Sequence, residues 1–174
     1  LALAWGWKRF TLVLLLAFVG FMRMGELMSM RRCHVLLPGD LLSDKLVLFL
    51  KIVDPKTRRV VLRQHARIGD ELTVRFATTL LADLPADAPL YPGSPAVFER
   101  RWDRVFSELG IPIKSEVGGV TPGCLRGSGA TWFYIITDDI PRLAWKGRWF
   151  QQRTLEHCLQ EVGGQVLLAQ LPTE

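Results

Sequence analysis

The chain opens with a long apolar run that basic residues flank on both sides. The run FTLVLLLAFVGFM, residues 10–22, is thirteen residues long, whereas a helix that spans a bilayer needs about 20 apolar residues. It could also be the core of a signal peptide, but no small-residue cleavage site follows it. We therefore predict a buried core helix here, within one or two helices over residues 1–31, where Gly20 and Gly25 mark either a close approach or a helix break.

Short aliphatic segments around a turn predict a β-hairpin in the middle of the chain. The segment KLVLFLKIV, residues 45–53, is rich in aliphatic and β-branched side chains and is too short for a typical helix. DPKT, residues 54–57, supplies turn chemistry. RRVVLRQHARI, residues 58–68, follows as the second strand, so the two segments are expected to pair.

Helices are predicted on both sides of a proline-rich connection. Residues 71–83 return to a helical pattern, and residues 96–109 place their apolar side chains on one face until Gly110 ends the pattern. Between them, residues 84–95 contain four prolines. This composition predicts a connection that runs over the surface.

Further helices are predicted towards the C-terminus. Thr121 and Pro122 are a typical N-cap and first-turn pair, so a helix is expected to begin there and to carry Arg126. Gly127 and Gly129 would weaken an isolated helix, and they indicate tight packing or a nearby backbone.

A short helix over residues 137–147 and a last helix over residues 153–162 complete the pattern. The sequence thus predicts a mainly α-helical fold with one small antiparallel sheet, in the α+β class.

Composition is compatible with one globular domain over residues 1–174. Apolar residues make up 49% and charged residues 22%, which argues against disorder. The 22 Lys and Arg exceed the 17 Asp and Glu, and a net charge of +5 suits a polyanionic partner. Basic residues cluster at 58–67, 100–104 and 142–153, although a solvated face would explain any one cluster.

The three cysteines are odd in number and form no C-x-x-C pair. We therefore predict a reducing, intracellular compartment, with neither a disulfide framework nor a zinc ribbon. Adjacent Cys33 and His34 point in different directions in a regular element, so they predict no metal site. Because the chain begins at Leu1 in apolar sequence, we expect it to be a fragment of a longer protein.

Two arginines lie in sequence that resembles a protein core. Arg23 is surrounded by apolar residues in GFMRMGEL, and Arg126 lies among small and apolar residues in TPGCLRGSGAT. A buried, unpaired charge costs several kcal/mol. Each arginine could pair with a carboxylate, as Arg23 with Glu26, or the two could converge and clamp an oxyanion such as a phosphate. The residues alone leave both explanations open.

Four segments, in order, resemble the tyrosine recombinases, the phage-integrase-like enzymes. GFMRMGEL resembles their first arginine box and TPGCLRGSGAT the second, H-x-L-R before a small-residue helix. WKGRWFQQRTLEHCLQEV, residues 145–162, resembles the closing box, in the G-R-W form of eukaryotic mobile elements. KIVDPKTRRVVL, residues 51–62, resembles the hairpin that carries the catalytic lysine. The resemblance covers nearly the whole chain and implies the catalytic-domain fold of DNA breaking-rejoining enzymes, here without an amino-terminal core-binding domain.

The resemblance also implies roles for single residues. Arg23 and Arg126 would hold the non-bridging oxygens of the scissile phosphate and stabilise its transition state. Lys56 would protonate the leaving 5′-oxygen, with Lys51 as the competing candidate and a lysine on a solvated strand edge as the alternative for both. Trp149 would pack against the phosphate and donate a hydrogen bond, or be an ordinary core aromatic. Further contacts to DNA are expected from Lys146, Arg148 and Arg153.

Two positions depart from the family pattern. Gly123 stands where the family has the histidine of H-x-L-R, and Cys158 stands where it has the tyrosine nucleophile. A thiolate favours carbon and sulfur over phosphorus, and a cysteine side chain is shorter than a tyrosine. We therefore expect strand cleavage to be impaired.

The resemblance implies double-stranded DNA as the partner, an oligomer on DNA, and no metal or other cofactor. It also implies a location in the nucleus if the source is eukaryotic. One alternative is a non-catalytic DNA-binding or scaffold domain. The other is a helical, membrane-associated interaction protein, in which Arg23 and Arg126 would lie far apart and be paired separately.

Overall fold

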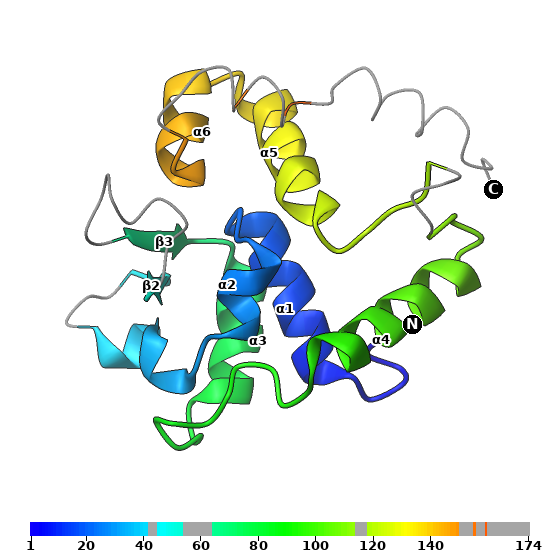
Figure 1. The fold of residues 1–174 in the computed structure, drawn as a ribbon. Coiled ribbons are helices and arrows are strands. Elements are labelled where there is room, and N and C mark those ends of the chain that lie inside the picture. The colour runs from blue at the N-terminus through cyan, green and yellow to red at the C-terminus, as the bar shows by residue number, and fades with distance from the viewer. Residues whose placement is uncertain (42–44, 54–63, 114–117, 150–154, 156–158, 160–174) are drawn as a thin grey trace.

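A computed structural model describes residues 1–41, 45–53, 64–113, 118–149, 155 and 159 of the chain. In these ranges, helices pack beside and behind a small antiparallel sheet (Figure 1), which confirms the predicted α+β class. The helices are α1 (Lys8–Val19), α2 (Met24–Met28), α3 (Glu71–Leu81), α4 (Pro95–Glu108), α5 (Cys124–Thr137) and α6 (Ile140–Gly147). The strands are β1 (Val35–Leu36), β2 (Leu48–Ile52) and β3 (Gln64–Ile68).

The sheet has the order β1-β2-β3, and both pairs of strands are antiparallel. The pairing of β2 with β3 confirms the predicted hairpin, whose turn, residues 54–57, lies outside the described residues. Side chains alternate between a buried and a more exposed face along β2 and β3. The third strand, β1, was not predicted, because two residues are too few to show a period.

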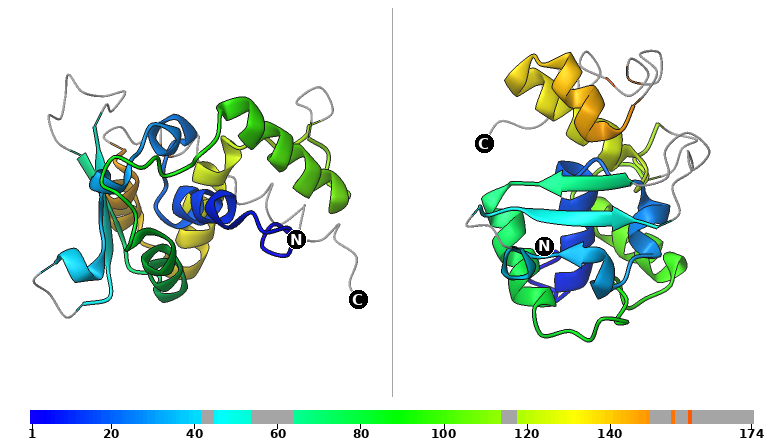
Figure 2. Two further views of the ribbon diagram at one scale, coloured as in Figure 1. Left: turned by 90° about the horizontal axis from the view of Figure 1, so that it is seen from below. Right: turned by 90° about the vertical axis from the view of Figure 1, so that its left-hand side faces the viewer.

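Helix α1 lies at the centre of the molecule, between the sheet side and α5 (Figures 1 and 2). Its side chains Phe10, Leu12, Val13, Leu16 and Ala17 are buried, which confirms the predicted core helix. No helix among the described residues is long and apolar enough to cross a membrane.

Helices α3 and α4 begin at side-chain caps, close to their predicted limits. Asp70 accepts a hydrogen bond from the N–H of Thr73, and Ser94 accepts one from the N–H of Val97. The connection between the two helices is only partly at the surface, so its prediction is wrong for Leu90 and Tyr91, which are 0% and 2% exposed. The backbone N–H of Leu90 donates to the carbonyl of Met30, which draws this segment into the core.

Helix α5 begins at Cys124, later than the predicted start at Thr121 and Pro122. Thr121 instead begins the turn that leads into the helix, in which its carbonyl accepts from the N–H of Cys124. The expected close approach at Gly129 is confirmed, since a Cβ atom there would collide with the backbone carbonyl of Phe18 in α1.

Helix α6 follows directly and confirms the short helix predicted over residues 137–147. Asp139 caps its first turn by accepting from the N–H of Arg142. The predicted last helix, residues 153–162, lies outside the described residues except for Leu155 and Leu159. A second, smaller apolar cluster includes residues of α5 and α6. Its buried side chains include Phe21, Phe133, Leu143, Trp149 and Leu155.

Candidate functional site

The candidate site is built around the carboxylate of Glu26 in the first turn of α2. Arg23, the residue before this helix, donates its backbone N–H to Glu26 Oε2 at 3.0 Å. Its Nη1 also donates to Glu26 Oε1 at 2.9 Å. The carboxylate satisfies an N–H at the start of the helix, where the positive end of the dipole favours a negative charge. The Glu26 side chain is 5% exposed, whereas that of Arg23 is 33% exposed.

Arg148 reaches the same carboxylate from the far end of the chain. It caps α6 in the left-handed conformation, with φ 59° and ψ 39°. Its Nη2 donates to Glu26 Oε2 at 3.0 Å and approaches the carbonyl of Phe21 at 3.4 Å. Phe21 is also left-handed, with φ 50°. Two non-glycine residues in this region each cost on the order of 1–3 kcal/mol, so tertiary contacts must hold both turns.

The environment of Arg148 is unfavourable for a charge apart from the contact with Glu26. The Arg148 side chain is 7% exposed. Burial lowers its pKa, nearby Arg23 lowers it further, and Glu26 raises it. Burial therefore outweighs the single carboxylate, and the side chain lies inside the cluster rather than on an open surface.

Arg126, in the first turn of α5, is buried against the last residue of α6 and against Trp149, which follows that helix. Its Nη2 donates to the carbonyl of Gly147 at 2.7 Å, and its guanidinium carbon lies 4.9 Å from the centroid of the Trp149 ring. This stacking is a cation–π contact. Gly147 is required there, because a Cβ atom would collide with the ring of Trp149.

The three-residue turn Gly147-Arg148-Trp149 thus connects the two arginine boxes. Gly147 and Trp149 contact Arg126. Arg148 shares the carboxylate of Glu26 with Arg23. We call these residues the arginine cluster: Arg23, Glu26, Arg126, Arg148 and Trp149. It holds three guanidiniums and one carboxylate, and so keeps an excess of positive charge. The pairing of Arg23 with Glu26, one of the two explanations left open by the sequence, is present within it.

Lys146 extends the positive charge towards the sheet. Its ammonium lies 4.6 Å from the ring centroid of Phe133 and 5.4 Å from that of Phe21. Burial lowers the pKa of Lys146, and the charges of Arg142 and Arg67 lower it further. Arg67 lies in β3, so α6 and the sheet bring their cations close together.

Three of the predicted residues, Lys56, Arg153 and Cys158, lie outside the described residues. Lys51 is exposed on β2, directly opposite His65. Among the described strands, β1 pairs only with Phe49 and Leu50 of β2, so Lys51 has a strand partner on the β3 side alone.

Gly123 precedes α5, and a Cβ atom there would meet only the Thr121 hydroxyl, at 3.7 Å. The position therefore has room for the first atom of a side chain.

Sequence reasoning missed the bridging role of Glu26, which it considered only as a partner of Arg23. The spacing of Arg23 and Glu26 indicated that one contact, because residues three apart meet within a helical turn. Nothing in the local sequence indicated the contact with Arg148, which depends on the left-handed turns at Phe21 and Arg148.

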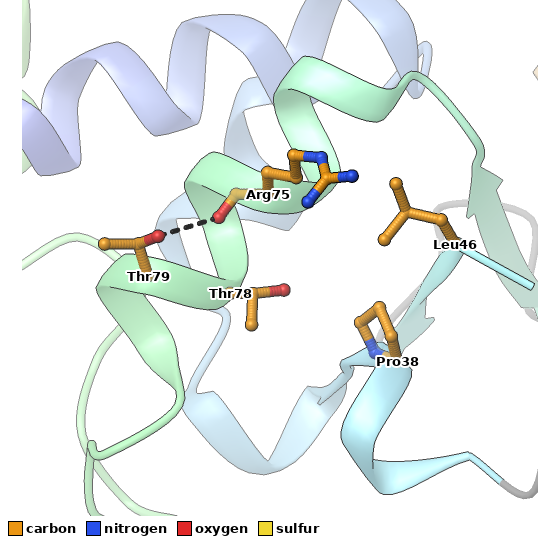
Figure 3. Close-up of a pocket in the computed structure, with 5 residues that line it drawn as sticks. All are labelled: Pro38, Leu46, Arg75, Thr78 and Thr79. Carbon is orange, nitrogen blue, oxygen red and sulfur yellow. Dashed lines mark hydrogen bonds between the residues drawn. The ribbon is translucent and has the colours of Figure 1, made fainter. Parts of the chain in front are cut away.

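Other groups in the described part of the chain are weaker candidates for a functional site. No group of three or more His, Cys, Asp or Glu side chains there could hold a metal ion. A surface pocket of about 380 Å³ lies between α3 and the segment before β2 (Figure 3). It is lined by Pro38, Leu46, Arg75, Thr78 and Thr79, and it shares no residue with the arginine cluster.

Comparison with known proteins gives no match, either to a protein-family model or to a curated protein. The resemblance to the tyrosine recombinases therefore rests on the sequence motifs.

Proposed function

We propose that this chain is a duplex-DNA-binding domain of the tyrosine-recombinase type whose own strand cleavage is impaired. In this proposal it has the catalytic-domain fold of DNA breaking-rejoining enzymes. The observation that carries the proposal is the arginine cluster, in which the three boxes quoted above meet although Glu26 and Arg148 are 122 residues apart. The membrane-associated alternative predicts instead that the two arginine boxes lie apart.

A DNA phosphate would bind at the side of the cluster that Arg23 exposes. Arg23 is its most accessible guanidinium, and Glu26 divides its negative charge between Arg23 and Arg148. A phosphate can therefore compete for Arg23 without leaving Glu26 unpaired. Arg126 carries the second charge and orients Trp149. Arginine suits this role because its planar fork matches the geometry of phosphate oxygens.

Impaired cleavage follows from two missing groups. In the family reaction a tyrosine oxygen attacks phosphorus, and the 5′-oxygen leaves with a proton from the hairpin lysine, here assigned to Lys56. Cys158 offers a shorter side chain whose thiolate is a poor nucleophile towards phosphorus. Gly123 offers no group that could donate or accept a proton. A non-catalytic DNA-binding scaffold differs from this proposal only in turnover.

Binding is tested by fluorescence anisotropy with a labelled duplex over a salt titration. The affinity of the wild-type protein should fall steeply with salt, because bound cations displace counterions from the phosphates. Arg126→Gln should weaken binding. A flat salt titration contradicts the proposal and favours the membrane-associated alternative.

Cleavage is tested with a nicked suicide duplex, which traps a covalent protein–DNA adduct. The wild-type chain should form none, and the double variant Gly123→His with Cys158→Tyr should form one. A wild-type adduct that disappears in Cys158→Ala would show that the native chain cuts DNA. No adduct from the double variant would favour the scaffold.

A further inference from the structure

The outward face of the sheet is uncovered and basic. Lys51, His65 and Arg67 are exposed there, and Phe49 is half-buried among them. We call these four residues the sheet face. Figure 2 (right) shows the strands in front of α1 and α3, and no described α-helix covers them from this side.

The register gathers these side chains into two rows. Lys51 pairs directly with His65, and Phe49 pairs with Arg67. Opposed residues lie about 5 Å apart, and residues two positions apart on one strand lie about 6.8 Å apart. Lys51 and Arg67, the two residues of this face that are charged at pH 7, therefore lie on a diagonal, roughly 7–8 Å apart.

No acidic side chain neutralises this face within the described strands. Strands β1, β2 and β3 contain neither Asp nor Glu. Among the described residues, no carboxylate forms an ion pair with Lys51 or Arg67. Lys51 also acts on His34. Burial lowers the pKa of His34, and the charges of Lys51 and Arg31 lower it further.

The sheet face continues into the arginine cluster. Arg67 lies close enough to Lys146 to act on its charge, and Lys146 packs over Phe21. Phe21 in turn lies against Trp149, with ring centroids 6.1 Å apart, and its carbonyl is approached by Arg148. These contacts place the arginine cluster beside the Arg67 end of the sheet face, with Phe21 and Trp149 buried between them.

We infer that the sheet face is a second contact surface for the phosphate backbone of the duplex held at the arginine cluster. This inference rests on the proposed function and adds the path of the DNA across the protein. Lys51 and Arg67 are two exposed cations with no carboxylate on the described strands between them, and such a face suits the uniformly negative phosphate backbone of a nucleic acid. The face would hold the duplex without selecting its sequence, because phosphates are the same in every sequence.

The test measures salt-dependent binding of a labelled duplex by four variants: Arg67→Gln, Lys51→Gln with Arg67→Gln, Arg100→Gln and Arg126→Gln. Arg67→Gln should raise Kd about fivefold at physiological salt and reduce the slope of log K against log salt by about 0.9. The double variant should reduce the slope by about 1.8. Arg100→Gln is the matched control, because Arg100 is an exposed arginine on α4, on the other side of α1 from the sheet (Figure 1). It should leave the slope unchanged.

The outcomes separate the inference from the proposed function. If the wild-type protein and the Arg126→Gln variant differ but Arg67→Gln binds like the wild type, the inference is wrong and the proposed function stands. If the wild-type protein does not bind the duplex, both are wrong. Equal binding of polyglutamate, with the same loss in Arg67→Gln, overturns the assignment to nucleic acid. Circular-dichroism melting of every variant shows whether it is folded.

Discussion

Glu26 accepts hydrogen bonds from the guanidinium groups of Arg23 and Arg148, on different carboxylate oxygens, at 2.9 and 3.0 Å. Arg23 lies three residues before it, whereas Arg148 reaches it from 122 residues further along the chain. The carboxylate therefore fastens the turn after α6 to the start of α2. Because the Glu26 and Arg148 side chains are 5% and 7% exposed, their pairing is an internal ion pair rather than a surface one.

Removing this carboxylate should destabilise the fold strongly. In Glu26→Gln the Arg148 charge stays buried without a compensating carboxylate, so the free energy of unfolding should fall by about 3–5 kcal/mol. Glu71→Gln is the control, because its pair with Arg75 has both side chains 68% exposed. The control should cost less than about 1 kcal/mol. Urea unfolding measures both, and equal losses would show that Glu26 is not holding a buried charge.

The contact between α1 and α5 should tolerate no side chain at Gly129. Gly129→Ala places a methyl group against the carbonyl of Phe18, and the free energy of unfolding should fall by about 3 kcal/mol. Gly25→Ala, in α2, meets nothing within 4 Å and should be neutral or stabilising by up to about 1 kcal/mol. Thermal melting compares the two helical glycines. Similar melting temperatures would mean that the helices do not touch at Gly129.

The elements that the sequence predicted well are those with a local signal. Helix α4 repeats its apolar positions with the helical period, and the β2–β3 pair is indicated by two short segments on either side of turn residues, the first of them rich in aliphatic side chains. Strand β1 is too short for such a window, and Leu90 in the proline-rich connection is buried by its hydrogen bond to Met30 rather than by any local pattern. Local sequence also placed the start of α5 too early, because Thr121 resembles an N-cap although a turn occupies it.

The residues of the candidate site can also be separated into those that a local motif indicates and those that it does not. Motifs identified Arg23, Arg126 and Trp149, because each lies in a short stretch of unusual residues. The buried role of Arg148 was not predictable, since it depends on a left-handed residue that no local rule requires there. The resemblance predicts that Arg148 contacts DNA, and this stays a prediction; the Arg148 side chain is 7% exposed beside Glu26.

The two described cysteines should differ in reactivity. Cys33 is exposed, whereas burial raises the pKa of the Cys124 thiol. Because the thiolate is the reactive form, iodoacetamide should modify Cys124 more slowly than Cys33. Peptide mapping by mass spectrometry gives the two rates separately. In urea the difference should disappear, and a difference that persisted there would point to local sequence rather than burial.

Asp40 should contribute stability that is lost in acid. The N–H of Leu37 holds the pKa of this carboxyl below its ordinary value of 3.8, and Arg32 lowers it further. Since the folded-state pKa is the lower one, the contribution is present above about pH 4 and is lost as the pH falls through the folded value. Asp40→Asn should therefore melt lower than the wild type near neutrality, with the gap closing in acid. Asp83→Asn, which removes an exposed carboxyl, serves as the control.

Because Arg126 stacks on Trp149, even the conservative change Arg126→Lys should destabilise the fold. Lysine keeps the charge but lacks the planar group that lies 4.9 Å from the ring centroid and donates to Gly147. Arg126→Lys should therefore lower the free energy of unfolding by about 2 kcal/mol, from lost cation–π and hydrogen-bond energy.

A double-mutant cycle with Trp149→Leu, which removes the aromatic ring, isolates the stacking itself. The two residues should show a coupling energy of about 1 kcal/mol, because both changes act on one contact. DNA binding should weaken in Arg126→Lys as well, since a lysine cannot hold two phosphate oxygens with a rigid fork. If the cycle gives additive energies while DNA binding still falls, Arg126 meets the phosphate independently of Trp149. If stability falls without any effect on DNA binding, Arg126 serves the fold alone and the proposed phosphate clamp loses one of its two arginines.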